Sequence, residues 1–326
     1  MKNFTFVQPK KAATLPNLLA SQEGVTLPYA GGTDALARMK EGLLAPEQVI
    51  YLNALPELSG IKENKKEIDI GAVTTITELA AHPAVQATTG LREAALSVAT
   101  LQLRNMGTVG GNLCQRPRCW YYRNRLFPCL RKGGDVCFAV NGDNKYHAIL
   151  GGDPCFIVHP SDLAPMLLAL NAGVMIRHPK GENRLALENF FVLPAKDVQH
   201  ENVLAPQEIV TRILVPKQPQ LRSHYIKFRE RQSFDFAMVS VAVAAQVGIT
   251  TVRDLRIVFG GVAPKPWRAR KAEQILEGRP LTEELLTKAA KAEMEEAMAL
   301  DQNGYKIILA KNLLQRALRE LMAQPR

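Results

Sequence analysis

All five cysteines of this 326-residue chain lie between positions 114 and 155. A glycine-rich run at 107–112 stands directly before them, and the motif SDLAP follows at 161–165. Glycines let backbone N–H groups approach a phosphate closely, whereas thiolates are soft ligands for metals. We expect the chain to bring a phosphate cradle and a group of thiols side by side.

The cysteine spacing leaves several kinds of site open. It reads Cys-x4-Cys-x9-Cys-x7-Cys-x17-Cys, without the paired Cys-x2-Cys steps that are typical of zinc sites. An odd number of cysteines in a cytoplasmic chain argues against disulfides. Iron–sulfur clusters need four thiolates and tolerate looser spacing, so they are favoured over zinc and over structural or reactive thiols. Cys114 is the candidate for the spare thiol, because it directly follows the glycine turn.

Two glycine turns are candidates for phosphate binding. Residues 30–34 (AGGTD) stand between a predicted strand and a predicted helix, and residues 107–112 (GTVGGN) offer amides, a hydroxyl and a side-chain amide. Either run could instead serve turn geometry alone. Asp162 stands at a predicted helix start, so it is either an N-cap or an acceptor for sugar hydroxyls. Lys227 reads most simply as a solvated lysine on a strand.

The net charge of +10 does not indicate nucleic-acid binding, because the basic residues form no stripe with aromatic side chains. A modest group of basic residues at 116–132 coincides with the cysteines. It is either a solvated surface or a group that offsets thiolates, phosphates or an acidic partner. We find no membrane span and no signal peptide. We expect a cytoplasmic protein, with export alongside a signal-bearing partner left open.

Periodicity predicts a small strand–helix–strand unit at the N-terminus, with helices at 14–22 and 35–41. A capping box at 75–78 opens another helix, and a hairpin surrounds 179–182. The segment 216–220 is the best domain boundary. Three strands follow it, then a helix from Thr282 to about Leu300 and a last helix at 305–322. Strands followed by helices predict an α+β domain.

Four motifs in order resemble the FAD-binding medium subunit of the xanthine dehydrogenase and carbon monoxide dehydrogenase family of molybdenum hydroxylases. They are AGGTD at 30–34 with Met39 and Lys40, residues 102–112, SDLAP at 161–165, and KFRERQSFDFAMV at 227–239. A fifth, GGVAP at 260–264, is similar to the C-terminal domain of the family. The resemblance implies an α+β chain. A two-part α/β FAD-binding domain of the PCMH type at 1–216 would precede an α+β C-terminal domain at 222–326, a three-stranded sheet plus helices.

The resemblance also implies which residues bind FAD. The first turn would wrap the pyrophosphate with its backbone amides, and the second turn would form the opposite wall. Asp162 would bind the ribityl or ring side, Lys227 would sit by the flavin, and Val98 and Val210 would line the isoalloxazine ring. The full set is Pro28, Tyr29, Ala30, Gly31, Gly32, Thr33, Asp34, Val98, Thr108, Gly111, Asn112, Asp162, Val210 and Lys227.

An insertion at about 114–158 is similar to that of a subgroup containing the 4-hydroxybenzoyl-CoA reductase β subunit and the bacterial aldehyde oxidoreductase FAD subunit. In that subgroup the insertion carries an extra [4Fe–4S] cluster. By position, the implied ligands here are Cys119, Cys129, Cys137 and Cys155. Cys119 follows Arg118 and precedes three aromatic residues, as the first ligand does there. The spacing is closer to the aldehyde oxidoreductase type.

The function implied is that of an electron-transfer subunit, an oxidoreductase component without catalytic residues of its own. Its partners would be a small [2Fe–2S] subunit, a large molybdopterin subunit, and an external carrier such as ferredoxin or NAD(P). One alternative is a stand-alone flavin reductase or oxidase of the same fold, although the sequence offers no substrate pocket or acid–base residues for it. Another is a zinc-stabilised interaction subunit.

Overall fold

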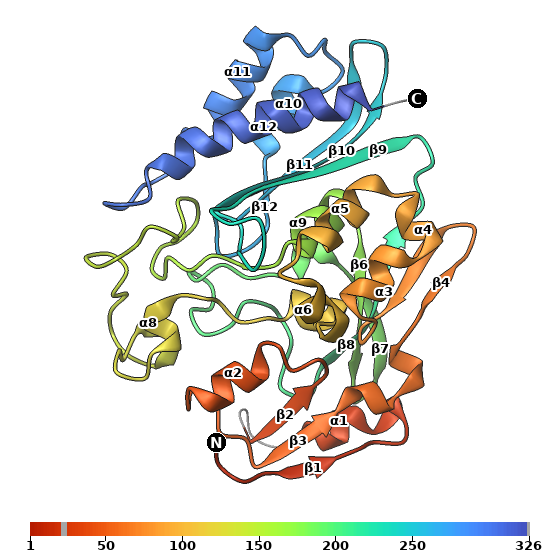
Figure 1. Cartoon of the computed structure of the whole chain (residues 1–326), viewed down its shortest axis with the longest axis vertical. Coiled ribbons are helices and arrows are strands. Elements are labelled where there is room, and N and C mark those ends of the chain that lie inside the picture. The colour runs from red at the N-terminus through yellow and green to blue at the C-terminus, as the bar shows by residue number, and fades with distance from the viewer. Residues whose placement is uncertain (21–24, 325–326) are drawn as a thin grey trace.

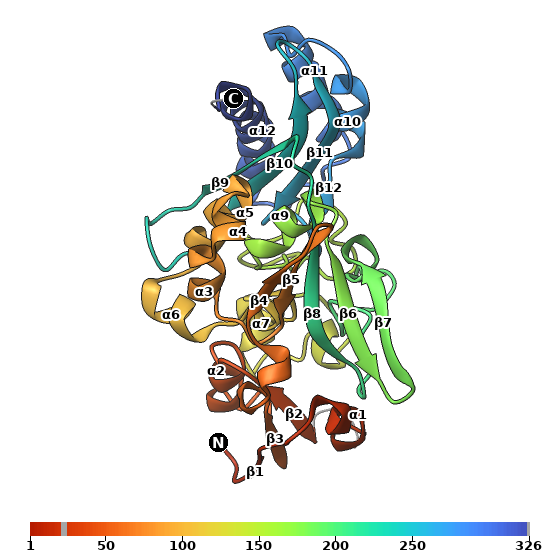
Figure 2. The ribbon, with the colours of Figure 1, turned by 90° about the vertical axis from the view of Figure 1, so that its right-hand side faces the viewer.

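Three β-sheets follow one another along the molecule in the computed structural model, which describes residues 1–20 and 25–324. Figure 1 shows the N-terminal sheet at one end, a larger sheet in the middle, and the C-terminal sheet with its helices at the other end. The turned view in Figure 2 keeps the same order. This mixed α/β architecture agrees with the predicted two-part FAD domain and α+β C-terminal domain. Within the described residues, no helix is long and apolar enough to cross a membrane.

The N-terminal sheet is parallel and has three strands in the order β1-β3-β2. Its strands are β1 (Thr5–Val7), β2 (Thr26–Tyr29) and β3 (Gln48–Tyr51). The first glycine turn links β2 to α2 (Ala35–Lys40), as the strand–turn–helix pattern predicts. The helix predicted over 14–22 is shorter: a 3-10 turn, Ala12–Thr14, leads into α1 (Leu15–Leu18). Residues 21–22 of that prediction lie outside the described residues.

The middle sheet is antiparallel, with strands in the order β4-β5-β8-β6-β7. These are β4 (Ile61–Glu63), β5 (Glu67–Gly71), β6 (Gly173–His178), β7 (Gly181–Ala186) and β8 (Ile209–Pro216). Its helices are α3 (Ile76–Ala81), α4 (Pro83–Gln86), α5 (Thr89–Ser97), α6 (Leu101–Met106), α7 (Val109–Leu113) and α9 (Leu163–Ala169). The predicted capping box is present at Thr75 and Glu78. Sheet and helices share one apolar core.

The C-terminal sheet has the order β12-β11-β10-β9, so it has four strands rather than the predicted three. They are β9 (Leu221–Phe228), β10 (Val239–Val247), β11 (Val252–Gly260) and β12 (Trp267–Arg268). The added strand is only two residues long, because Pro264 and Pro266 before it have no N–H to donate. Three helices pack on this sheet around a second core: α10 (Arg270–Leu276), α11 (Glu283–Glu293) and α12 (Tyr305–Ala323).

The helix predicted from Thr282 to about Leu300 ends early, at Glu293. Thr282 does cap its start, since its side chain accepts a hydrogen bond from the Leu285 N–H. Beyond the helix end, the Met298 N–H donates to the Ile149 carbonyl at 2.8 Å. A contact with the distant cysteine segment thus takes an N–H that a longer helix would have used.

The cysteine segment at 114–158 has little regular structure. It holds one short helix, α8 (Trp120–Arg123), and one 3-10 turn, Leu130–Lys132. Figure 1 shows this yellow-green segment on one side of the molecule, between the N-terminal and C-terminal sheets. Because this segment has few backbone hydrogen-bond ladders, side-chain hydrogen bonds hold its backbone in place. The buried Asn144 donates to the Ala139 carbonyl at 3.0 Å and accepts from the Gln302 N–H at 2.9 Å.

Candidate functional site

A cleft of about 620 Å³ opens where the two glycine turns meet. Its volume lies within the range of protein sites for small molecules and cofactors. Twelve of the fourteen residues that the family resemblance assigns to FAD line this cleft. They are Pro28, Tyr29, Ala30, Gly31, Gly32, Thr33, Asp34, Val98, Thr108, Gly111, Asn112 and Asp162.

The two turns approach each other so closely that they require glycine. A Cβ at Gly31 would lie 1.8 Å from the Met106 carbonyl oxygen, at the end of α6. Gly32 has a φ of +69°, and a Cβ there would collide with the Tyr29 hydroxyl at 2.2 Å. The AGGTD turn therefore uses both glycines for backbone geometry, which leaves its amides at the edge of the cleft.

The second turn is a helix start, which the sequence analysis missed. Thr108 is the N-cap of α7, and its hydroxyl accepts a hydrogen bond from the Gly111 N–H at 3.2 Å. The run GTVGGN reads as a plain loop because two adjacent glycines disfavour a helix. Tertiary packing overrides this preference: a Cβ at Gly110 would lie 2.9 Å from Ala72. Asn112 accepts a hydrogen bond from the Ser161 hydroxyl, which joins the second turn to the SDLAP motif.

Asp162 stands at the N-cap position of α9, as predicted, but its side chain makes no capping hydrogen bond. The neighbouring Ser161 hydroxyl accepts from the Ala164 N–H instead, at 2.9 Å. The Asp162 carboxylate is buried and accepts hydrogen bonds from the Tyr225 hydroxyl and the Lys227 ammonium, both at 2.7 Å. Burial and the Asp162 charge raise the pKa of Tyr225 well above its usual value.

Lys227 is not a solvated lysine, because only 3% of its side chain is exposed. Besides Asp162, it donates to the Ser97 carbonyl at 3.0 Å. Lys227 is absent from the described cleft lining and reaches the cleft through Asp162. Val210 lies in β8 inside the apolar core of the middle sheet, and it too is absent from that lining.

The loop 229–236 supplies cleft residues that the sequence analysis did not single out. Arg231, Phe234 and Phe236 all line the cleft, and both phenylalanines are largely exposed. Phe234 has a φ of +57°, and its N–H donates to the Ala99 carbonyl at 3.2 Å, where Ala99 itself has a φ of +43°. The motif at 227–239 contained these aromatic residues, but no periodic pattern showed where they point.

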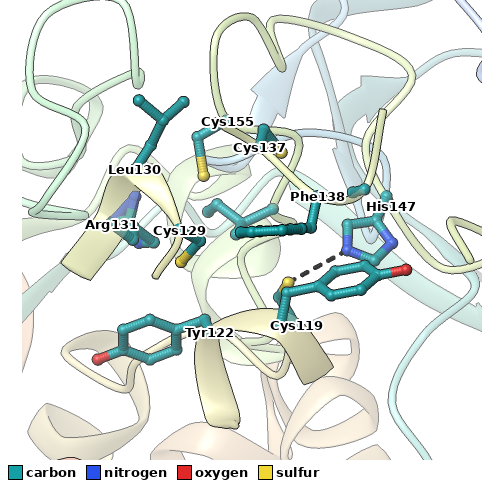
Figure 3. A pocket seen from close by; sticks show the side chains of 12 residues that line it. Cys119, Tyr122, Cys129, Leu130, Arg131, Cys137, Phe138, His147 and Cys155 are labelled. Carbon is teal, nitrogen blue, oxygen red and sulfur yellow. Dashed lines mark hydrogen bonds between the residues drawn. The ribbon is translucent and has the colours of Figure 1, made fainter. Parts of the chain in front are cut away.

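Four of the five cysteines line a second cavity, separate from the large cleft. Figure 3 shows Cys119, Cys129, Cys137 and Cys155 around a common space, with Arg131 on one side and His147 on the other. Cys114 instead lines the large cleft. The fold thus divides the five thiols into a group of four and a single one.

Burial and contacts set the protonation of these thiols. Burial raises the pKa of Cys119 to about 11. The Cys155 thiol donates to Cys137, which lowers the pKa of Cys137 to about 6 and raises that of Cys155. In the described part of the chain, no three Cys, His, Asp or Glu side chains are placed to hold a single metal ion. The four thiols surround the cavity without converging on one point.

Most of the basic group at 116–132 is paired inside the protein, so the prediction of a solvated surface is wrong for its four paired arginines. Arg116 and Arg131 both pair with the buried Glu201. Arg118 and Arg123 pair with Asp34 of the first glycine turn. These partners come from 80 or so residues away in each direction, and sequence spacing gives no sign of them.

Two buried nitrogen atoms at the cysteine cavity, Arg131 Nε and His147 Nδ1, have no hydrogen-bond partner in the described structure. Arg131 lines the cavity, its side chain is 1% exposed, and its Nε–H is buried and unpaired. Buried donors are nearly always satisfied. An anionic group inside the cavity would supply the missing acceptor and would also meet the positive charge of Arg131.

A third cleft, of about 320 Å³, connects the surroundings of the other two sites. It shares Arg118 and Phe236 with the large cleft, and Cys119 and His147 with the cysteine cavity. The Arg118 guanidinium lies 5.1 Å from the centre of the Phe236 ring. The two candidate cofactor sites are therefore neighbours in space, as their closeness in sequence suggests.

Comparison with known families decides what the large cleft is for. Residues 2–218 match the family described as "FAD binding domain in molybdopterin dehydrogenase", and residues 224–321 match "CO dehydrogenase flavoprotein C-terminal domain". The chain is an FAD-binding medium subunit of the xanthine and carbon monoxide dehydrogenase family. As a member of this family, the chain is an oxidoreductase component. The two matches confirm the family and the fold that the motifs predicted.

Individual relatives support the same assignment. This chain is 33% identical over 332 residues to the aldehyde oxidoreductase FAD-binding subunit PaoB of Escherichia coli, with 99% of this chain and 100% of that protein covered. It is 28% identical to the carbon monoxide dehydrogenase medium chain of Hydrogenophaga pseudoflava, with 98% of each covered. A solved structure of that Hydrogenophaga enzyme superposes with a TM-score of 0.79 over 99% of this chain and 98% of that chain.

Proposed function

We propose that this FAD-binding subunit is an electron-transfer subunit that also carries a [4Fe–4S] cluster. It would pass electrons between the [2Fe–2S] clusters of a small subunit and an external acceptor or donor. Its substrate-oxidising partner would be a large molybdopterin subunit. The observation that carries the proposal is the arrangement of four thiols around one cavity beside the FAD cleft.

FAD would lie in the large cleft, with the amides of the two glycine turns around its pyrophosphate. The short contact between Gly31 and Met106 supports this role, because it holds the two turns together at the cleft edge. Val98 would face the flavin ring, and Asp162 would accept from the ribityl or ring side. Lys227 would act through Asp162, and we leave Val210 out of the site because it lies in the core.

Residues 1–216 and 222–326 would be the two domains of the chain.

The ligands of the cluster would be Cys119, Cys129, Cys137 and Cys155. A single zinc ion holds its thiolates about 3.8 Å apart, given a Zn–S distance near 2.3 Å in a tetrahedron. A cluster gives each thiolate its own iron, so it suits thiols spread around a cavity. The unpaired Nε–H of Arg131 supports an anionic occupant, and the placement of Cys114 in the other cleft leaves a set of four.

The chemistry that the bound groups would supply is the joining of one-electron carriers to a two-electron reaction. The chain itself would fix their relative positions. Asp34, which lines the FAD cleft, pairs with Arg118 directly before Cys119 and with Arg123 after it, so ion pairs connect the two sites. The external carrier would be ferredoxin or NAD(P).

The proposal is tested by cofactor analysis of the full chain purified without oxygen. We expect about one FAD, four iron and four acid-labile sulfide per chain. A Cys129→Ser variant should lose the iron and keep the FAD. The matched control is Cys114→Ser, which should keep both. FAD without iron in the wild-type chain would overturn the cluster while leaving the family assignment intact.

A further inference from the structure

We infer that His147 donates a hydrogen bond to Cys119 and thereby raises the reduction potential of the proposed cluster. The inference rests on the proposed function and adds a positioning residue to it. His147 is not a ligand in this scheme. It would act on the cluster only through the sulfur atom of Cys119.

The contact itself is specific. The His147 Nε2 atom lies 3.3 Å from the Cys119 Sγ atom, and Figure 3 shows the imidazole turned toward this sulfur. The other ring nitrogen, Nδ1, is buried without a partner, so the tautomer with its proton on Nε2 leaves no buried N–H unpaired. His147 is 4% exposed, so water has little access to replace the contact. A ligating thiolate accepts hydrogen bonds, and an N–H donor stabilises the extra negative charge that the cluster gains on reduction. The reduction potential therefore rises.

The ring is held in place from several sides. It lies 5.6 Å from the Trp120 ring and 6.1 Å from the Tyr121 ring, measured between ring centres. Its backbone N–H donates to the Asn144 carbonyl at 2.9 Å, and its carbonyl accepts from the Asn303 side chain at 3.2 Å. The backbone and the ring of His147 are thus already held in place. Its N–H can therefore point at the Cys119 sulfur without a further loss of conformational entropy.

Asn303, which is distant from His147 in the sequence, helps to hold His147 in place. It lies just before α12, it is fully buried, and its amide also donates to the Ala148 carbonyl at 3.2 Å. Nearby, the buried Lys306 donates to the Tyr146 carbonyl at 2.7 Å. The C-terminal domain thus sets the position of a side chain that contacts the cysteine site of the FAD domain.

The hydrogen bond falls on the ligand that faces the flavin side. Cys119 and His147 both line the 320 Å³ cleft, which also borders the FAD cleft through Arg118 and Phe236. The thiolate whose charge His147 offsets is therefore the one between the two redox groups. A donor at this position favours an electron on the cluster over an electron left on the flavin.

The test compares three variants of the full chain by iron content and by redox titration followed with electron paramagnetic resonance. His147→Phe keeps a planar ring and removes the donor. His147→Gln keeps an N–H donor and should rescue the effect. His159→Phe is the matched control, because His159 is an equally buried histidine whose Nε2 faces the Leu113 carbonyl rather than a thiol.

We expect His147→Phe to keep its FAD and iron and to show a lower midpoint potential. At the wild-type midpoint, the ratio of reduced to oxidised cluster should fall about tenfold, which corresponds to about 59 mV for a one-electron couple. His147→Gln should stay near the wild-type midpoint, and so should His159→Phe. Iron loading of His147→Gln with a wild-type midpoint supports the inference even where His147→Phe loads no iron.

Two results would overturn the inference. One is an unchanged midpoint in His147→Phe. The other is loss of iron from both His147 variants, which would mean that the ring only fills space. A wild-type chain that binds FAD but no iron is a different outcome, because it removes the proposed cluster and not the role of His147 alone.

Discussion

The Asp34 carboxylate lies 2.7 Å from the Arg118 guanidinium, so the last residue of the first glycine turn is joined to the residue before Cys119. The same carboxylate pairs with Arg123 and accepts the backbone N–H of Arg116 at 3.2 Å. Although burial opposes the charged form, Arg118 and Arg123 hold the pKa of Asp34 below its usual value. One carboxylate therefore organises the entrance to the cysteine segment and one wall of the FAD cleft.

Replacing this carboxylate should disturb both sites at once. In Asp34→Asn, Arg118 and Arg123 would lose their counter-charge in a place where the Asp34 side chain is only 17% exposed. We expect the free energy of unfolding to fall by about 3 kcal/mol, since breaking a buried ion pair leaves uncompensated charge. FAD content should fall with it. Denaturant unfolding and flavin extraction measure the two effects, and Glu63→Gln, in an exposed pair with Lys217, serves as the control. A variant with wild-type stability would show that the pairs contribute nothing.

A methyl group at Gly31 should separate the two glycine turns. The new Cβ would lie 1.8 Å from the Met106 carbonyl oxygen, which is backbone and cannot rotate away. We expect Gly31→Ala to weaken FAD binding about tenfold or more, because overpacking costs about 1–3 kcal/mol. Flavin fluorescence on dilution measures the affinity. The control is Gly304→Ala, where the new Cβ meets only Ala299 at 3.7 Å. Equal affinity in Gly31→Ala would mean that the cleft does not depend on the contact between the turns.

Sequence patterns predicted the parts of this site that depend on local geometry. The AGGTD turn needs glycine at Gly32 for a local reason, its positive φ and the nearby Tyr29 hydroxyl, whereas the close approach of Met106 to Gly31 comes from a distant segment. The clustering of the cysteines likewise pointed to one site before any contact was known. Twelve of the residues that the family resemblance assigns to FAD line the cleft.

The remainder depends on pairings between distant segments. The sequence around Arg131 suggests a surface residue. In the structure Arg131 instead pairs with Glu201, 70 positions later. Lys227 in β9 and Asp162 directly before α9 are 65 positions apart and become a buried pair only in the folded chain. The early end of α11 has the same origin. No spacing rule in a single sequence reports such contacts.

The buried pair of Lys227 and Asp162 should be worth more to stability than its exposed counterparts. Their charged atoms are 2.7 Å apart, with side chains 3% and 5% exposed. We expect Lys227→Met to lower the free energy of unfolding by about 3–5 kcal/mol, because it leaves the Asp162 carboxylate buried without its cation. Adding Asp162→Asn should recover part of this loss, with a coupling energy of about 1–3 kcal/mol.

The control for this cycle is the exposed pair of Lys217 and Glu63. Its side chains are 36% and 43% exposed, so its cycle should give a coupling of about 0–1 kcal/mol. Denaturant unfolding of all variants provides the measurement. Equal coupling in the two cycles would contradict the idea that Lys227 and Asp162 form the buried support of the FAD cleft.

His224 should make stability depend on pH. Its Nδ1 atom lies 2.9 Å from Glu93 in α5, and its Nε2 atom lies 2.7 Å from Glu320 in α12, so the imidazolium bridges the two domains. Although burial opposes the charge, Glu93 and Glu320 raise the pKa of His224 above its usual value near 6.5. A raised pKa stabilises the fold fully below about pH 6.5, and the gain is lost as pH rises through the higher folded value.

We therefore expect His224→Gln to cost more stability at about pH 6 than at about pH 9, because the wild-type ring loses its charge as pH rises through its raised pKa. Urea unfolding of both proteins at the two pH values gives this difference directly. His178→Gln is the control, because the His178 ring accepts from the Lys180 backbone N–H and faces no such pair of carboxylates. If His224→Gln cost the same at both pH values, the bridge between α5 and α12 would owe its strength to hydrogen bonds and packing rather than to the charge of the ring.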